Sequence, residues 1–302
     1  GAEIAFADIT AHGMLIDPVD VERVAAKTVA EGRRVSAIIA VHLAGEVADM
    51  QALRAVANRY NAVLIEDAAH AFPARTAVGY AGTLGDIGVF SFYANKTITT
   101  GEGGMVVTST KEIAERVRTM RLHGIDREAW DRYSDPRGGW QYDVVEAGFK
   151  YNMTDIAAAI GRVQLRRAES LLTSRRAAAE RYRESLAPLE QETQVTLPQH
   201  REGHAWHLFI LRTNGIHQDR DELIAALKDV GIGVSVHYTP LHRMSYWADR
   251  YPNAAAYLPH TEQRFREILS LPLYPDITTT EQDAVTDTVV RIVRDRIREG
   301  VR

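Results

Sequence analysis

The sequence contains no cysteine, which excludes disulfide bonds and thiolate metal sites. It also lacks an apolar run near the length of about 20 residues that a membrane-spanning helix needs. Its N-terminus shows no charged-then-apolar signal pattern. Neither sign of charge dominates, because 36 Lys and Arg residues face 40 Asp and Glu residues, for a formal net charge of −4. This balance does not favour nucleic acid or an anionic membrane as a partner. We therefore expect a cytoplasmic protein.

Strand and helix patterns alternate along the first third of the chain. The expected elements are a strand over 3–9, a helix opened by Asp17 and Pro18, a strand over 35–41, a helix over 50–60, and strands over 63–65 and 87–92. Alternation of this kind predicts an α/β fold with a mostly parallel sheet flanked by helices. The length of 302 residues leaves room for a second subdomain.

The second half of the chain is dominated by helical patterns. Thr154 is the expected N-cap of a helix whose buried face would be formed by Ile156, Ile160, Val163 and Leu165. A charged helix over 166–186 should follow, with solvated arginines. Prolines punctuate residues 188–198, where the helical periodicity stops. This predicts a large domain over 1–187 and a small C-terminal α+β domain over 188–302.

Three reactive side chains follow the apolar strands at their carboxyl ends. Asp67 and Ser91 stand at strand ends, and Lys96 lies in the loop just past one. In open α/β sheets, ligands bind in the crevice beyond the carboxyl ends of the strands. The pattern thus predicts that a carboxylate, a hydroxyl and an amine meet in one crevice.

Those three groups match the needs of an aldehyde cofactor that carries a basic ring nitrogen and a phosphate. A lysine amine forms a Schiff base with the aldehyde, and a carboxylate keeps the ring nitrogen protonated. Hydroxyls and backbone N–H groups hold the phosphate. This chemistry points to pyridoxal 5′-phosphate.

Four segments carry a closer resemblance: EDAAHA, GDIGVFSFYANKTITTGEGGM, RLHGI and YNMTDIAAAIGRVQL. From about Ile4 to the C-terminal region, the chain resembles the DegT/DnrJ/EryC1/StrS family of sugar aminotransferases, which are fold type I pyridoxal phosphate enzymes. The resemblance implies pyridoxal 5′-phosphate as the cofactor. It also implies an antiparallel return strand after the Gly103-Gly104 turn. Members of the family normally have several dozen further residues before the point at which this sequence begins, including a phosphate-binding segment and a ring that stacks on the cofactor.

The resemblance implies a catalytic role for Lys96 and Asp67. Lys96 matches the family's Schiff-base lysine, which also carries a proton as general base and then general acid. Its alternative is a solvated charge in a polar loop. Asp67 matches the partner of the ring nitrogen, whose pKa a neighbouring carboxylate raises. Its alternative is a helix N-cap.

The resemblance also implies which other residues bind the cofactor. Ala69 would lie close to the ring and His70 near the ring hydroxyl. Ser91 would bind the phosphate, unless it is a buried strand serine bonded to the backbone. Asn152 would reach the phosphate from the neighbouring subunit, unless it is an ordinary helix cap. Its match predicts a homodimer with shared active sites.

The remaining candidates are histidines and one aromatic loop. His237 and His242 lie near a strand end without a carboxylate pattern around them, so we expect a substrate contact at His237 and no metal site. His42 is expected to be structural or to line the crevice. The loop over 126–149 is rich in Trp and Tyr and is expected to be an interface or active-site loop.

Together these observations predict an aminotransferase that passes an amino group, from glutamate by family habit, to a nucleotide-linked keto-sugar. One alternative is a non-enzymatic scaffold or regulatory relative with an incomplete cofactor site. The other is a dehydratase of the same family, although dehydratases usually carry histidine in place of Lys96.

Overall fold

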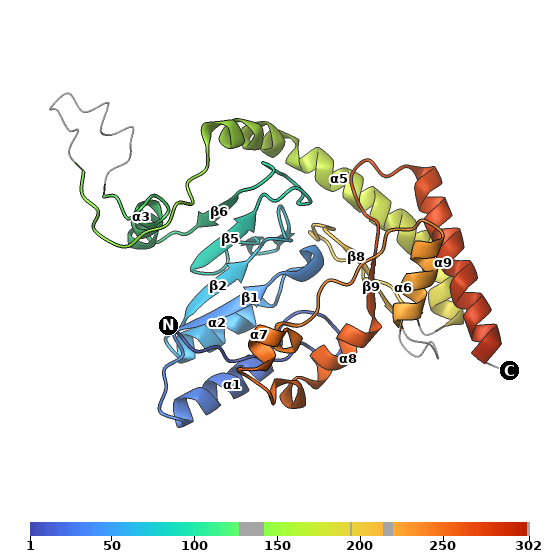
Figure 1. Cartoon of the computed structure of the whole chain (residues 1–302), viewed down its shortest axis with the longest axis horizontal. Coiled ribbons are helices and arrows are strands. Elements are labelled where there is room, and N and C mark those ends of the chain that lie inside the picture. Colours follow the sequence, from blue (N-terminus) through green and yellow to red (C-terminus); the bar gives the residue numbers. More distant parts are fainter. Residues whose placement is uncertain (127–141, 194, 214–219, 301–302) are drawn as a thin grey trace.

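The computed structural model describes residues 1–126, 142–193, 195–213 and 220–300. A four-stranded sheet with its helices forms one side of the molecule, and a three-stranded sheet with the longest helices forms the other (Figure 1). This arrangement confirms the predicted α/β fold with a smaller C-terminal α+β part. Most of the aromatic loop predicted over 126–149 lies outside the described residues.

The larger sheet has the strand order β1-β2-β5-β6. Its strands are β1 (Ala37–Val41), β2 (Val63–Asp67), β5 (Ile87–Ser91) and β6 (Gly104–Val107). β1, β2 and β5 run parallel, and β6 pairs antiparallel with β5, as the resemblance implies. Val41 lies opposite Asp67, and Asp67 lies opposite Val89. The carboxyl ends of the three parallel strands therefore share one edge of the sheet.

Helices α1 (Pro18–Ala30) and α2 (Met50–Arg59) cover one face of this sheet. Asp17 and Asp49 cap them by accepting hydrogen bonds from backbone N–H groups, and such a cap contributes about 1 kcal/mol. The apolar faces of both helices pack against Ile38, Ala40 and Leu64 of the strands. The opposite face carries exposed apolar side chains at Ile39, Val41, Val63, Val89 and Val106.

The strand predicted over 3–9 is wrong. This segment makes a single β-bridge between Ile9 and Ile16. Its Asp8 is buried and accepts hydrogen bonds from the backbone N–H groups of His260 and Thr261, at 2.9 and 2.8 Å. Asp8 thereby caps helix α8 (Pro259–Glu267) and ties the start of the chain to its C-terminal third. An alternating pattern predicts one buried side, but not a pairing partner.

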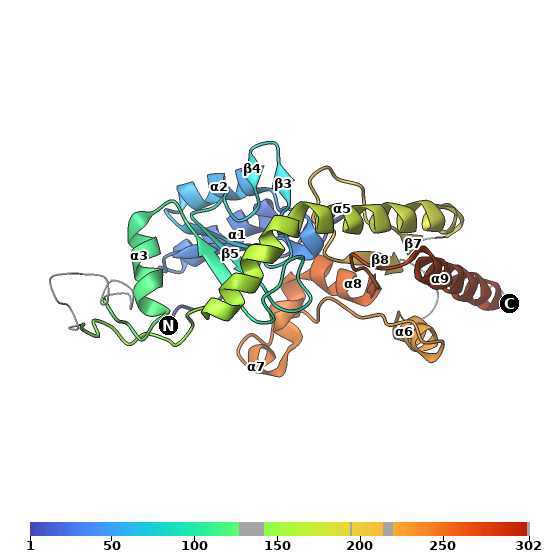
Figure 2. The same cartoon turned by 90° about the horizontal axis from the view of Figure 1, so that it is seen from above.

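The longest helix, α5 (Asp155–Glu192), runs from the neighbourhood of β6 to the C-terminal part (Figure 1; Figure 2). Thr154 caps it as predicted. It continues through Pro188 rather than ending at 186. The predicted burial of its first apolar stripe is wrong, because other parts of the described chain do not cover the helix there: the exposed fractions are 77% for Ile156, 45% for Ile160, 48% for Val163 and 56% for Leu165.

The smaller sheet is antiparallel, with the order β7-β8-β9. Its strands are β7 (Val195–Thr196), β8 (Phe209–Thr213) and β9 (Ile268–Leu271). Helices α6 (Arg220–Asp229) and α9 (Thr279–Gly300) share a hydrophobic core with it. That core includes Tyr182, Leu186 and Leu189 of α5, which lie on both sides of the predicted boundary at 187–188. The boundary itself stays a prediction.

Short elements complete the chain. They are η1 (Leu43–Gly45), β3 (Arg75–Thr76), β4 (Gly79–Tyr80), α3 (Lys111–Met120), η2 (Leu241–Arg243), α7 (Ser245–Ala248) and η3 (Ala254–Tyr257). Ser235 makes an isolated antiparallel bridge with Ser270 of β9. Within the described ranges, we find no helix that is long and apolar enough to cross a membrane.

Candidate active site

The strand ends place two of the predicted residues on one face of the larger sheet. Asp67 ends β2 and Ser91 ends β5. Because side chains alternate between the two faces of a strand, the pairing of Asp67 with Val89 puts Ser91 on the same face as Asp67. This is the face that α1 and α2 leave open. Asp67 and Ser91 therefore lie at the predicted edge of the sheet and on one face of it.

Lys96 lies in the loop after β5 and is partly buried. Burial lowers the pKa of its amine, and the negative charge of Asp67 opposes that shift. A lowered pKa increases the neutral fraction of the amine, which is the nucleophilic form. Asp67 accepts a hydrogen bond from the backbone N–H of Ala69 at 3.0 Å, which fixes the carboxylate at the start of the following turn.

Glu66, the residue before Asp67, points to the opposite face and anchors this strand end. Its side chain is fully buried, and it accepts hydrogen bonds from the backbone N–H groups of Gly82, Leu84 and Gly85 and from Nε2 of His42. Burial raises the pKa of Glu66, but the hydrogen bonds from His42 and from Gly85 and Gly82 outweigh it and hold the pKa below its usual value. His42 is fully buried in this network, in keeping with the predicted structural role.

The start of α5 supports the loop that carries Lys96. Ile98 packs with Phe92 and with Ala168 of the helix. Gly103 adopts a φ of +154°, and a Cβ there would lie 2.5 Å from the hydroxyl oxygen of Thr100. A residue with a side chain would therefore displace this turn. Close packing restrains the backbone on both sides of Lys96.

His70 contacts residues from two distant parts of the chain, Ala44 of η1 and Tyr238 of the C-terminal part. Its Nδ1 accepts a hydrogen bond from the backbone N–H of Ala44 at 3.4 Å, and its Nε2 lies 3.1 Å from the hydroxyl of Tyr238. Burial lowers the pKa of His70 to about 3, with further contributions from the charges of Lys96 and His237. The imidazole is therefore neutral at physiological pH.

His207 belongs to this cluster, although sequence reasoning missed it. Its ring centroid lies 4.2 Å from that of His70, and its side chain is only 4% exposed. Neither ring nitrogen has a hydrogen-bond partner among the described residues. Burial is the largest cause that lowers its pKa, to about 2. Its position at the entry to β8 was a weak signal, because only the tertiary fold brings β8 to the end of β2.

His237 lies beside the cluster, whereas His242 does not belong to it. Nδ1 of His237 is 2.8 Å from the hydroxyl of Ser270, and its pKa is lowered by burial and by the charge of Lys96. His242 instead contacts Glu262 at 2.7 Å. In the part of the chain that the structure describes, no group of three His, Cys, Asp or Glu side chains could hold a metal ion.

Three further residues were predicted to bind the cofactor: Ser91, Ala69 and Asn152. The hydroxyl oxygen of Ser91 accepts a hydrogen bond from the backbone N–H of Tyr93 at 3.3 Å, so its proton can be donated elsewhere. Ala69 follows the Asp67 turn and is partly exposed. Asn152 bonds to its sequence neighbours Lys150 and Met153 and not to the cluster around Lys96. Its predicted role would be performed in a neighbouring subunit.

One arginine of α5 corrects the expectation that the arginines over 166–186 are solvated. Arg175 is buried and donates to the backbone carbonyls of Trp206, His207 and Leu273. Burial lowers its pKa to about 10. Arg175 is therefore a buried cation whose hydrogen bonds fix the backbone next to His207.

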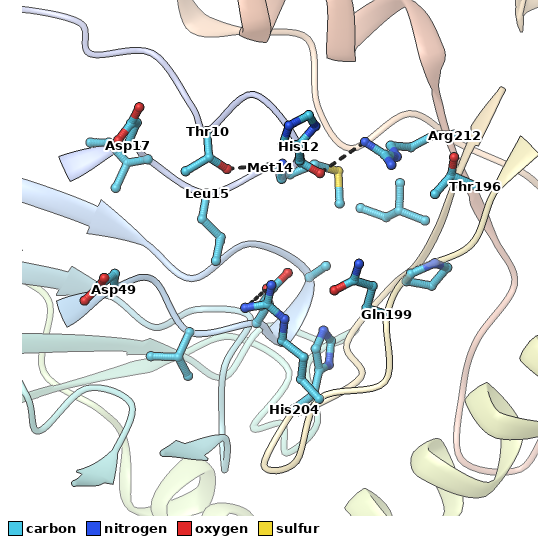
Figure 3. Close-up of a pocket in the computed structure, with 18 of the residues that line it drawn as sticks. Thr10, His12, Met14, Leu15, Asp17, Asp49, Thr196, Gln199, His204 and Arg212 are labelled. Atoms are coloured by element: carbon cyan, nitrogen blue, oxygen red, sulfur yellow. Dashed lines mark hydrogen bonds and ion pairs between the residues drawn. The ribbon is translucent and has the colours of Figure 1, made fainter. Parts of the chain in front are cut away.

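A cavity lies between the 10–19 segment and the segment around Gln199 and His204 (Figure 3). Its volume is about 540 Å³, and it is lined by residues of the 10–19 segment, of α2 and of β8. Arg201 and Glu46 form an ion pair of 2.8 Å in its wall, and Arg212 donates to the backbone carbonyl of His12. Ala44 lines this cavity while its N–H contacts His70, so η1 separates it from the Lys96 cluster.

The residues around Lys96 fit a pyridoxal phosphate group. They include an amine of lowered pKa in the field of a carboxylate, a serine hydroxyl oxygen that accepts one backbone N–H, and a buried histidine with two nitrogens unpartnered among the described residues. The donor set combines a cation, neutral donors and one carboxylate, which suits an anionic group with a basic ring nitrogen.

Comparisons with known proteins identify a single family. The sequence model described as the DegT/DnrJ/EryC1/StrS aminotransferase family matches residues 1–290. The spore coat polysaccharide biosynthesis protein SpsC of Bacillus subtilis is 39% identical over 300 residues, which is 97% of this chain and 74% of SpsC.

Solved structures agree with this result. The putative sugar aminotransferase Spr1654 of Streptococcus pneumoniae in its PLP form has a TM-score of 0.84 at 28% identity, covering 98% of this chain and 76% of that one. DesI in the presence of its TDP-sugar product has a TM-score of 0.80 at 29% identity, covering 98% of this chain and 70% of that one.

Proposed function

This chain belongs to the DegT/DnrJ/EryC1/StrS aminotransferase family, and from that premise we propose that it transfers an amino group from glutamate to the keto group of a nucleotide-linked keto-sugar. Its cofactor is pyridoxal 5′-phosphate, and its fold is the fold type I architecture of its neighbours. The observation that carries the proposal is the position of Lys96, with a pKa lowered by burial, within the field of Asp67. The nucleotide-linked substrate is proposed because DesI, a structural neighbour, was solved with a TDP-sugar product.

Each residue of the cluster has a distinct role in this proposal. When bound, the cofactor supplies the carbonyl that accepts the amino group and a ring that withdraws electrons. Lys96 would hold it through Nζ, with Asp67 at the ring nitrogen, Ala69 and His70 at the ring, and Ser91 at the phosphate. The free amine of Lys96 would carry the proton from Cα of the donor to the cofactor carbon, acting as general base and then as general acid. His237 would contact the sugar substrate.

Proton transfer by Lys96 requires a neutral amine near physiological pH. Burial favours the neutral form by lowering the pKa of the amine, while Asp67 opposes the shift. Asp67 keeps its own orientation through the N–H of Ala69, so it can hold a proton on the ring nitrogen without rotating.

The function is tested with the pyridoxal phosphate-loaded protein, glutamate and a nucleotide-linked keto-sugar. We expect formation of 2-oxoglutarate in equal amount to a nucleotide-linked amino sugar, both followed by mass spectrometry. The control omits the sugar, in which case only one equivalent of 2-oxoglutarate per site should form. Loss of oxygen from the sugar without amine transfer would instead identify a dehydratase, and absence of any product would contradict the enzymatic proposal.

The proposed active form is a homodimer. Ile156, Ile160 and Val163 recur at helical spacing along the exposed side of α5 and form one apolar stripe. The stacked rings of Phe149 and Tyr151 precede this helix and are also exposed. Contiguous apolar surface of this kind is typical of protein interfaces. A second copy of this chain seated there would bring its Asn152 region toward a neighbouring site.

Replacement of Ile160 by Asp is expected to convert the dimer to a monomer, because it places a charge in the centre of the apolar stripe. The molar mass measured by light scattering after gel filtration should fall by half. Val19→Asp is the matched control, since Val19 is exposed on α1, away from the stripe, and this substitution should leave the mass unchanged.

If each active site combines residues of both subunits, two inactive variants should complement each other in a mixed dimer. Asn152→Ala and Lys96→Ala chains, each inactive alone, should regain activity when coexpressed, because a mixed dimer contains one site with both residues intact. Coexpression that restores no activity, or a wild-type protein that is monomeric, would contradict the shared-site arrangement.

A further inference from the structure

Tyr238 meets His70 across the junction between the two halves of the chain. Its hydroxyl oxygen lies 3.1 Å from Nε2 of His70, and the two residues are 168 positions apart in the sequence. Their rings lie 5.7 Å apart, and His207 packs on His70 at 4.2 Å. Tyr238 therefore belongs to the same cluster as His70 and His207.

The direction of the hydrogen bond between His70 and Tyr238 follows from the other ring nitrogen. The backbone N–H of Ala44 can only donate, so Nδ1 of His70 accepts and carries no proton. The imidazole is neutral because burial and the nearby charges of Lys96 and His237 lower its pKa to about 3. Its single ring proton is thus on Nε2, and Nε2 donates to the hydroxyl oxygen of Tyr238.

The hydroxyl proton of Tyr238 is consequently directed elsewhere. Burial and the charge of Asp67 raise the pKa of Tyr238, so the hydroxyl stays protonated. His70 cannot accept this proton, because its Nε2 already carries one. The residue is 48% exposed and lies within electrostatic reach of Asp67, so its hydroxyl proton remains available to a bound ligand.

We propose that Tyr238 is a substrate-binding residue whose hydroxyl donates a hydrogen bond to a carboxylate of the amino-acid donor, oriented by the hydrogen bond from His70. A carboxylate is the stronger acceptor for such a donor, because hydrogen bonds to ionised groups are shorter and stronger than neutral ones. The oxygens of a keto-sugar ring are neutral and would gain less. His207 is a positioning residue, since it packs against His70 and restricts the ring that orients Tyr238.

This inference rests on the proposed aminotransferase function and is tested by binding as well as by turnover. Glutarate, a dicarboxylate without an amino group, serves as the probe and is titrated into the pyridoxal phosphate-loaded protein by calorimetry. Tyr238→Phe keeps the ring and removes the hydroxyl. We expect its Kd for glutarate to rise about tenfold, which corresponds to about 1.4 kcal/mol. Tyr80→Phe, on the exposed β3–β4 hairpin, is the matched control and should bind as the wild type does.

Kinetics separate the donor from the acceptor sugar. Tyr238→Phe should raise KM for glutamate and leave KM for the keto-sugar unchanged, with thermal unfolding like that of the wild type. A Kd for glutarate equal to the wild-type value, or a rise in KM for the keto-sugar alone, would overturn the assignment while leaving the proposed function intact. A wild-type protein in which borohydride fixes no cofactor on Lys96 would instead refute the function, and the inference with it.

Discussion

Lys96→Ala is expected to abolish amino transfer, with turnover at least about 10⁴-fold below that of the wild type, because it removes both the attachment point and the general base. Alanine leaves the surrounding loop in place, since Ile98 and the turn at Gly103 hold it independently of the lysine side chain. The measurement combines 2-oxoglutarate formation with borohydride treatment. After digestion, mass spectrometry should find the reduced cofactor on the peptide that contains Lys96 in the wild type only.

Lys111→Ala provides the matched control for that experiment. Lys111 is exposed at the start of α3, where its amine lies 3.5 Å from Glu115. Loss of an exposed pair of this kind costs little stability, and activity should match that of the wild type. Trapped cofactor on another lysine, or comparable turnover in Lys96→Ala, would show that Lys96 is not the reactive amine.

Asp67→Asn is expected to lower turnover by about 10²–10³-fold, comparable to the loss of one preorganised electrostatic group in other active sites. Asparagine has the same size, and its carbonyl oxygen can still accept from the N–H of Ala69, so the turn is preserved. It removes the negative charge that favours a protonated ring nitrogen. The same charge also opposes the lowering of the Lys96 pKa, so the amine of the variant should titrate at lower pH.

Two measurements check this second prediction. Steady-state turnover gives the rate loss, and the pH dependence of Lys96 modification by an amine-directed reagent in the cofactor-free protein reports the shifted titration. Asp86→Asn is a suitable control, because it removes a carboxylate that lies just before β5, at the opposite edge of the same sheet, where Asp86 pairs with Arg54 at 2.9 Å. Equal rates for Asp67→Asn and Asp86→Asn would exclude a direct role of Asp67.

Local sequence patterns predicted which edge of the larger sheet carries Asp67 and Ser91. β-branched and aromatic runs that end in Asp67 and Ser91 fix the strands, and the parallel arrangement then brings their carboxyl ends to one edge of the sheet. The cap at Thr154 was equally local, since it depends on a side chain and a backbone N–H three residues away. Strand ends and helix caps depend on residues that are close together in the chain, so the sequence by itself determined them.

Packing between distant segments was decided by the tertiary structure alone. An apolar stripe at Ile156, Ile160 and Val163 indicates that something covers it, but the periodicity cannot say whether this chain or another one does. In the sequence, Arg175 is indistinguishable from the neighbouring arginines of the helix. Only the tertiary structure brings the backbone carbonyls of Trp206 and Leu273 within hydrogen-bond distance of its guanidinium group. The contact of Tyr238 with His70 and the packing of His207 depend on how β8 and the segment after residue 234 dock against the end of β2. The sequence determined which strand ends carry reactive groups, and the fold decided which neutral donors surround them, because the second depends on contacts between residues far apart in the chain.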